Sequence, residues 1–238
     1  MLKKVSVSVL TLVFSFLIIG GCSSSGGGGG SCPDTNTSIE VCDPDTGTFS
    51  LVIDNGFFPL VVGDELVLEG EDDEGTFLEV TITVLDETEV VAGVTTRVVE
   101  EEELEDGEVV EISRNFYAQA LDGTVCYFGE DVDDFEDGMI VGHGGEWRAG
   151  VDGNLPGIIM PANPEVGQIF QQEAAPGIAE DQAEVIALGE NISVPAGDFS
   201  DTLTTLDCNP MENGAIDEKV YVDGIGLAID EDAELVSF

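Results

Sequence analysis

The chain holds few residues of the types that carry out nucleophilic or zinc-assisted catalysis. His143 is its only histidine, and it lies among glycines in a stretch that predicts a loop. No Gly-x-Ser-x-Gly segment is present, and zinc hydrolase motifs need two histidines one helical turn apart, so the sequence excludes both kinds of hydrolase. A copper site that combines His143 with Met139 or Met160 is a remaining alternative, because imidazole and thioether ligands suit copper.

Acidic residues are so numerous that paired carboxylates carry no signal. The 50 Asp and Glu residues guarantee some pair at any separation, so a carboxylate-dependent hydrolase is kept only as an alternative. The sequence indicates no catalytic residue and no obligatory cofactor. It favours a non-enzymatic binding or structural protein.

The densest acidic stretch predicts a solvated loop, with calcium binding as the alternative. Its candidate ligands are Asp131, Asp133, Asp134, Glu136 and Asp137. The order of an EF-hand loop is missing, because Phe135 occupies a ligand position and Glu136 occupies the position of the turn glycine. Any calcium site here is therefore expected to be weak, and a divalent-cation-binding surface is a further alternative for the protein.

A second group of candidates mixes apolar bulk with polar side chains, as the rim of a ligand pocket does. Its members are Trp147, Arg148, Met160, Glu173 and Asp181. Arg148 is one of only six Lys and Arg residues, and we expect it to form a salt bridge with Glu173 or Asp181. In the alternative, Arg148 binds a ligand carboxylate. The group predicts a small apolar or anionic ligand.

These candidates fall in a segment, about 129–181, that glycine and proline interrupt throughout. Pro156, Pro161, Pro164 and Pro176 exclude long helices and central strands from much of it. The sequence therefore predicts a long irregular insertion, and a loop of such length in a compact domain is usually functional.

On either side of the insertion the hydrophobic pattern has a period of two residues. Between Leu78 and Val84, apolar residues alternate with Glu and Thr, which is typical of a strand with one dry face. The run Glu100–Glu103 is expected to be a solvated strand end. Turn pairs between strand-like runs predict hairpins, and they are Ala92-Gly93, Asp106-Gly107, Asp122-Gly123 and Asn213-Gly214.

The pattern as a whole predicts an all-β fold. We expect an antiparallel meander of about ten strands, curled into a barrel or half-barrel so that few edges stay exposed. The expected strands include 50–53, 78–84, 94–99, 124–128, 183–188, 192–194, 199–206, 216–222, 227–229 and 234–238.

The N-terminus predicts export. Lys3 and Lys4 precede an apolar run that ends at Ile19, a layout typical of a secretory signal and too short for a comfortable membrane span. The ending Ile19-Gly20-Gly21-Cys22 resembles the bacterial lipoprotein processing box, which implies cleavage and lipidation at Cys22. Ser23 resembles the residue that directs such proteins to the outer membrane, with a periplasmic or surface-facing domain. An ordinary signal peptide that is cut elsewhere is the alternative.

These features divide the chain into a signal peptide at 1–21, a lipidated Cys and flexible Ser/Gly tether at 22–48, and a β domain at 49–238. Cleavage would remove two of the six basic residues and no acidic one, which leaves four basic against 50 acidic residues and a formal charge of −46. Such a charge repels nucleic acid and excludes it as a partner. The predicted membrane contact is through the lipid anchor.

Several segments resemble a family of uncharacterised bacterial secreted and lipid-anchored β-rich proteins, across roughly residues 53–236. They are Phe57-Phe58-Pro59-Leu60, Val91-Ala92-Gly93-Val94, Phe116-Tyr117-Ala118-Gln119, Phe128-Gly129-Glu130, Trp147, Pro156-Gly157-Ile158, Met160-Pro161-Ala162, 177–181, Val194-Pro195-Ala196-Gly197, Lys219-Val220-Tyr221 and Gly224-Ile225-Gly226. The resemblance implies a single domain, and it implies no activity, cofactor or catalytic residue.

The cysteines after Cys22 predict two disulfides in an oxidising compartment, since an even number remains in an exported chain. A Cys32–Cys42 bridge would close a small N-terminal loop. Compared with the family, Cys126 and Cys208 are both additions, which implies that they pair with each other. The expected pairing is therefore Cys32–Cys42 and Cys126–Cys208.

Overall fold

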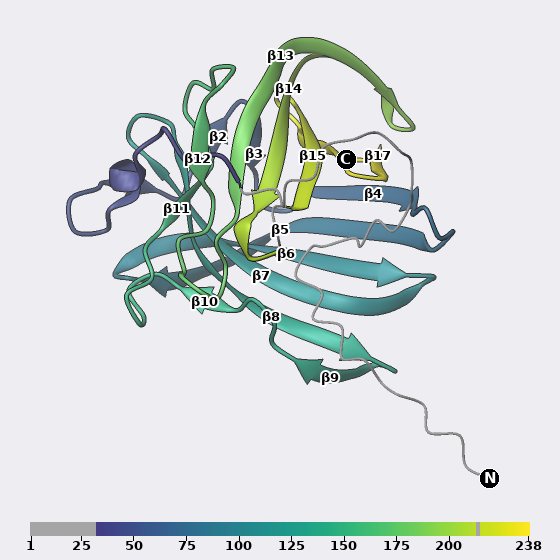
Figure 1. The fold of residues 1–238 in the computed structure, drawn as a ribbon, viewed down its shortest axis with the longest axis horizontal. Coiled ribbons are helices and arrows are strands. Elements are labelled where there is room, and N and C mark those ends of the chain that lie inside the picture. Colours follow the sequence, from purple (N-terminus) through teal and green to yellow (C-terminus); the bar gives the residue numbers. More distant parts are fainter. Residues whose placement is uncertain (1–31, 213–214) are drawn as a thin grey trace, which may run out of the picture.

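One large antiparallel sheet organises the protein. The computed structural model describes residues 32–212 and 215–238, and in these ranges the regular structure is strand with two 3-10 turns, η1 (Ile39–Cys42) and η2 (Pro210–Glu212) (Figure 1). The all-β class is confirmed. The strands are β1 (Phe49–Ser50), β2 (Ile53–Asn55), β3 (Phe58–Leu60), β4 (Glu65–Glu71), β5 (Phe77–Val91), β6 (Val94–Glu105), β7 (Glu108–Ala120), β8 (Val125–Glu136), β9 (Met139–Gly142), β10 (Trp147–Arg148), β11 (Gly157–Met160), β12 (Ile169–Gln171), β13 (Gln182–Val194), β14 (Gly197–Asn209), β15 (Ala215–Val222), β16 (Gly226–Asp230) and β17 (Ala233–Ser237).

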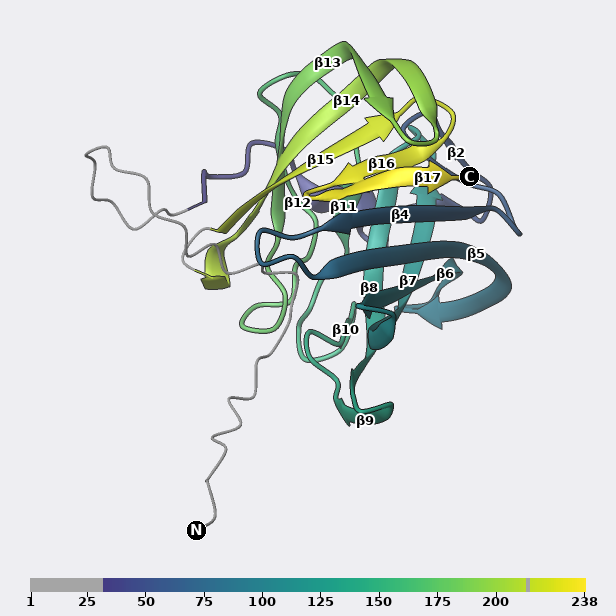
Figure 2. The ribbon, with the colours of Figure 1, turned by 90° about the vertical axis from the view of Figure 1, so that its right-hand side faces the viewer.

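The sheet consists of two meanders joined through the C-terminal strand. Its order is β10-β8-β7-β6-β5-β4-β17-β16-β15-β14-β13-β12, and the meanders meet where Leu235 of β17 pairs with Leu68 of β4. Figure 2 shows β15, β16 and β17 beside β4 and β5. Strands β1, β9 and β11 add to this path, and β2 and β3 form a separate pair.

The sheet is strongly curved. In Figure 1, β4 to β8 lie side by side while β13 and β14 run across them at a steep angle. Buried residues of both meanders share one apolar cluster, in which Phe116 and Phe128 pack with Phe170 and Leu203. The described end strands β10 and β12 do not pair with each other, and only a single bridge between Leu155 and Ala174 joins the segments near them. The sheet is thus described as open.

The hairpin predictions hold for β5 to β8. Ala92-Gly93 and Asp106-Gly107 connect consecutive strands, and all four residues have positive φ. Two consecutive residues with positive φ form a type I′ turn, whose twist matches that of the two antiparallel strands it connects. Asp122-Gly123 lies in the connection from β7 to β8. The turn predicted at Asn213-Gly214 lies outside the described residues.

The number and extent of the strands differ from the prediction. The described residues contain seventeen strands rather than about ten, and several are short additions to the edges of the meanders. The insertion expected at 129–181 is strand as far as Glu136, where Asp137-Gly138 turns the chain into β9. Only residues 137–181 are largely irregular, and they still contribute β9 to β12.

The predicted disulfide pairing is wrong, although all four cysteines are bonded. The bonds join Cys32 to Cys208 and Cys42 to Cys126, across 176 and 84 residues. Segment 32–42 therefore connects β14 in one meander to β8 in the other. Local spacing favoured Cys32–Cys42, but a chain segment that crosses the sheet surface brings each cysteine to a distant strand.

Residues 32–48 consequently lie on the β domain rather than in a tether that ends at residue 48. The backbone N–H groups of Asn36 and Thr37 donate to Ile169 O at 2.9 and 3.0 Å, and the Asn36 side chain bonds Gly167 O at 2.8 Å. These bonds cover the free edge of β12, which would otherwise expose unpaired backbone groups.

Candidate functional site

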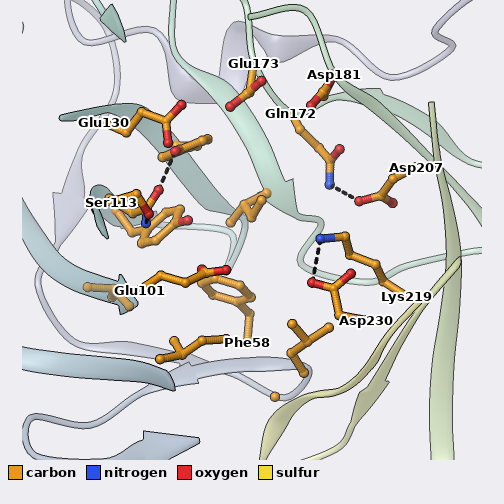
Figure 3. A pocket seen from close by; sticks show the side chains of 18 of the residues that line it. Phe58, Glu101, Ser113, Glu130, Gln172, Glu173, Asp181, Asp207, Lys219 and Asp230 are labelled. Atoms are coloured by element: carbon orange, nitrogen blue, oxygen red, sulfur yellow. Dashed lines mark hydrogen bonds and ion pairs between the residues drawn. The ribbon is translucent and has the colours of Figure 1, made fainter. Parts of the chain in front are cut away.

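A cavity of about 190 Å³ lies between the two meanders. Strands β6, β7 and β8 line one side, β14, β15 and β16 line the other, and Phe58 of β3 contributes an apolar surface (Figure 3). An engineered protein cavity of about 150 Å³ accepts benzene. The volume here therefore suits a small molecule of about one ring.

The wall formed by β6 and β7 follows from the two-residue period of a strand. Val99 and Glu101 of β6 face the cavity, as do Ser113, Asn115 and Tyr117 of β7. The register pairs Glu101 with Ser113 and Val99 with Asn115, so these side chains form adjacent rows on one face. Polar residues at every second position thus collect inside the curved sheet.

A bulge brings two further residues of β8 to the same wall. Tyr127 and Glu130 both line the cavity although they are three positions apart, a separation that regular alternation would place on opposite faces. The β7–β8 register shifts between them, with Asn115 opposite Glu130 and Tyr117 opposite Tyr127. Gly129 in the bulge has φ +127°, a conformation that glycine adopts most readily.

Among the described residues that line the cavity one is basic, and it lies on the opposite wall. Lys219 of β15 lies against Asp230 of β16, with Nζ 3.0 Å from Oδ2, and both are largely buried. A register shift between β15 and β16 lets Leu227 and Asp230 face the same side. The positive charge of Lys219 is thereby compensated by Asp230 on the neighbouring strand of the same wall.

Acidic side chains outnumber this one base by eight to one. Four glutamates and four aspartates of the described ranges line the cavity. They are Glu101, Glu111, Glu130, Glu173, Asp181, Asp207, Asp217 and Asp230. Figure 3 shows Glu130 and Glu173 on one side of the cavity and Asp207 and Asp230 near Lys219.

Burial raises the pKa values of Glu101, Glu111, Glu130, Glu173 and Asp207. The pKa of Glu101 rises to about 7, and those of Glu111 and Glu130 rise to about 8, in each case chiefly because burial disfavours the charged form. The pKa of Glu173 rises well above its usual range, first through burial and then through the charges of Glu130 and Asp181. At neutral pH several of these carboxyl groups therefore hold protons.

Aromatic rings form the surface next to Glu130. Tyr117 and Tyr127 stack with their ring centroids 4.8 Å apart, and Phe58 meets Tyr117 edge-on at 5.2 Å. The Tyr127 hydroxyl donates to Asn115 Oδ1 at 2.5 Å, and Asn115 Nδ2 donates to Ser113 Oγ at 2.9 Å. These contacts fix the orientation of the tyrosine rings and of the Asn115 side chain in the wall.

The predicted pocket residues lie only partly at this cavity. Glu173 and Asp181 line it. Trp147 is buried just behind the wall, where its ring meets Tyr127 edge-on at 5.4 Å. Met160 is fully buried in the apolar core, and it is not among the residues that line the cavity.

Arg148 forms salt bridges, but with partners other than those predicted. Its guanidinium contacts Asp131 at 2.5 Å and Glu89 at 3.1 Å, and it lies over the Phe116 ring at 4.6 Å. Arg148 does not line the cavity. It lies on β10, which pairs with β8 at the bulge and places Arg148 opposite Gly129. An anionic ligand held by Arg148 at this cavity therefore has no support.

The acidic residues 131–137 are mostly in a strand rather than a loop, so their side chains diverge. Asp131 binds Arg148, Asp133 lies 3.1 Å from His143 Nδ1, and the Asp134 carboxylate accepts from the Gly144 N–H at 2.8 Å. Glu136 and Asp137 are exposed at the hairpin end. Among the described residues, no group of three His, Cys, Asp or Glu side chains is placed to hold a metal ion.

His143 is an exposed loop residue, as predicted. Its Nδ1 lies 2.7 Å from Val132 O, and this hydrogen bond is the main cause that raises the pKa of the imidazole. The two methionines considered with it for copper lie in different environments, since Met139 is exposed on β9 and Met160 is buried.

Most of the cavity residues were not predicted from the sequence. The omitted residues include Glu101, Glu111, Glu130, Asp207, Asp217, Lys219 and Asp230. One signal was available in the sequence: Glu101 is two residues after the apolar Val99, so in a strand both side chains point to the same, inward face. The acidic character of 100–103 instead led to the prediction of a solvated strand end.

Comparisons with models of known protein families, with curated proteins and with solved structures find no match to this chain. The resemblance to secreted and lipid-anchored proteins therefore stays a prediction. Cys22, the predicted lipidation site, lies outside the described residues. In the ranges that are described, no helix has the length and apolar character needed to cross a bilayer.

Proposed function

We propose that the protein is a non-enzymatic binding module of the bacterial cell envelope, which holds a small molecule inside its curved sheet. The observation that carries this proposal is the cavity of about 190 Å³ between the meanders, with aromatic and apolar surface next to polar groups. Small-molecule sites commonly combine these features. In this proposal the sheet acts as a half-barrel around the ligand.

Two disulfides connect the N-terminal segment to strands next to the cavity, which supports a preformed binding site. Cys208, bonded to Cys32, lines the cavity, and the Cys42–Cys126 bond is fully buried beside β8. Two disulfides suit an oxidising compartment outside the cytoplasm.

We propose that the protein is anchored to the outer membrane through a lipid on Cys22. Loss of lipid-precursor labelling in the Cys22→Ala variant would support this anchor. A variant that is still labelled and membrane-bound would contradict it.

Binding is tested through Trp147, the single tryptophan of the chain, whose ring contacts Tyr127 of the cavity wall. The full chain is titrated with a set of molecules of one-ring size while Trp147 fluorescence is followed. Val99→Phe fills the cavity from an inward position, and Val90→Phe makes the same change at a site that is 62% exposed.

We expect a saturable fluorescence change for some probes with the unmodified chain and with Val90→Phe, and a loss of saturation with Val99→Phe. Circular dichroism would establish that both variants are folded. Absence of any saturable change with the unmodified chain, or equal binding by folded Val99→Phe, would contradict the proposal.

A carboxylate-dependent hydrolase is the second candidate. It is favoured by one observation, the raised pKa of Glu101 and Glu130 in a shared cavity, since a protonated carboxyl group is able to act as a general acid. Hydrolysis of aryl glycosides or esters that is abolished in both Glu101→Gln and Glu130→Gln would support this candidate. Absence of turnover with ligand binding intact would support the binding module.

A further inference from the structure

We propose that the cavity selects a small organic cation, with an aromatic or aliphatic body of about one ring and a protonated amine. This inference rests on the proposed binding function and specifies its ligand class. The amine lies among the carboxyl groups of Glu101, Glu130 and Glu173, and the body lies against the tyrosine wall.

The first argument is the charge of the cavity. In the part of the chain that the structure describes, eight carboxyl groups and one base line it, and that base, Lys219, is already paired with Asp230 at 3.0 Å. An ammonium group would supply the missing positive charge, whereas an anionic ligand would add to the repulsion.

A second observation is independent of the number of acids. Asp230 is 5% exposed, and its Oδ1 has no hydrogen-bond partner among the described residues although Oδ2 binds Lys219. A buried acceptor without a partner costs about 1–3 kcal/mol. Because Asp230 lines the cavity and only its Oδ2 is paired with Lys219, the second carboxylate oxygen adds to the negative potential that favours a bound cation over an anion.

The aromatic wall points to the same ligand chemistry. Tyr117 and Tyr127 are stacked, and the register places Glu130 of β8 opposite Asn115, two residues from Tyr117 on β7. Aromatic faces attract cations electrostatically. A molecule with one ring and one ammonium group would thus meet rings and carboxyl groups on neighbouring strands.

The arrangement fits an organic cation better than a metal ion. Among the described residues, no three carboxyl, His or Cys groups converge as a metal site requires. A cavity of about 190 Å³ also exceeds the space that a bare ion fills. Carboxyl groups spread around a larger volume are suited to a ligand that fills the space between them.

The test compares three probes of similar shape and different charge: benzylamine, benzyl alcohol and benzoate. Each is titrated into the full chain at pH 8 and low salt, with Trp147 fluorescence and isothermal titration calorimetry as readouts. Cation–π attraction and charge pairing together predict that benzylamine binds at least about tenfold more tightly than benzyl alcohol. Benzoate is expected to show no binding.

The variants Glu101→Gln and Glu130→Gln keep the size of the side chain and remove its charge. Each is expected to weaken benzylamine binding about tenfold while the affinity for benzyl alcohol stays unchanged. Glu102→Gln is the matched control, because Glu102 is the next residue of β6 and does not line the cavity. It should bind benzylamine as the unmodified chain does.

Each other outcome overturns a defined part of the account. If benzyl alcohol or benzoate binds as tightly as benzylamine, the cation inference fails and the binding function stands. If Glu102→Gln weakens benzylamine as much as Glu130→Gln does, the effect is one of general surface charge and the inference also fails. If no probe of the wider one-ring set binds, the proposed function fails with it.

Discussion

Tyr127 and Glu130 face the same cavity from one strand, although their separation of three residues would place them on opposite faces of a regular strand. The bulge at Gly129 is the cause, since two residues of β7 span the same distance as three of β8 at this point. The bulge thus joins the aromatic surface of the cavity to its acidic surface.

Gly129→Ala is expected to destabilise the protein by about 2–4 kcal/mol, because it combines steric overlap with an unfavourable φ. A Cβ at residue 129 would lie 2.2 Å from Trp147 O, and φ is +127°. Gly138→Ala is the control, since Gly138 also has positive φ but nothing lies near its Cβ position. It should cost only about 1 kcal/mol. Urea unfolding measures both, and equal losses would contradict the role assigned to close packing at Gly129.

The buried acids predict that stability falls as the pH rises. The folded-state pKa of Glu130 is about 8, above the unfolded value near 4.5, so its contribution is fully present below pH 4.5 and is lost as the pH rises through 8. The acidic groups that interact with Glu130 are Glu101, Glu111, Asp131, Glu173 and Asp181. Glu101, Glu111 and Glu173 strengthen the trend, because their pKa values are also raised and each further ionisation adds repulsion.

Glu130→Gln should therefore raise the free energy of unfolding by about 4 kcal/mol at pH 8.5 and by less than about 1 kcal/mol at pH 5. Glu102→Gln is the control, and it should leave the pH profile unchanged. Denaturant unfolding from pH 5 to 9 at constant ionic strength gives both profiles. A flat profile for the unmodified chain would show that these carboxyl groups are not desolvated.

Lys219→Met should cost about 3–5 kcal/mol, because it leaves Asp230 buried without its counter-charge. The double variant Lys219→Met/Asp230→Asn removes both charges and should recover most of the loss. Urea unfolding at pH 7 provides the comparison. A double variant that is as unstable as the single one would mean that packing of the lysine chain, rather than its charge, is what the site needs.

Removal of the Cys42–Cys126 bond should lower stability by about 4 kcal/mol in the chain-entropy model, since it closes a loop of 84 residues. The Cys32–Cys208 bond should contribute a comparable amount, because its cysteines are 176 residues apart. Paired Cys→Ser variants and non-reducing peptide mapping test both. A peptide that links Cys32 to Cys42 would contradict the observed connectivity.

Local patterns predicted much of the fold. The alternation at Leu78–Val84 predicts part of β5, and Asp106-Gly107 predicts the β6–β7 turn, because both depend on neighbouring residues. The disulfides depend instead on which distant strands the N-terminal segment meets. Short-range spacing carries no such information, and the predicted pairing was wrong for this reason.

The cavity was harder to predict because its signals conflict with ordinary sequence rules. Glu101 follows the phase of inward-facing Val99, yet a glutamate normally indicates a solvated position. Glu130 reaches the cavity through a bulge that breaks the two-residue period. Only the folded arrangement shows that these acids line one cavity together with Lys219.

The central claim is that a cation enters the cavity and is bound by carboxyl groups that are partly protonated before binding. Isothermal titration of benzylamine at pH 7.5, in phosphate and in Tris, tests it most directly because the two buffers differ in ionisation enthalpy. Groups such as Glu130, with a pKa of about 8, should release protons when the cation binds. We expect a buffer-dependent enthalpy that corresponds to about one released proton per ligand, reduced in Glu130→Gln. A binding enthalpy that is the same in both buffers would contradict the account.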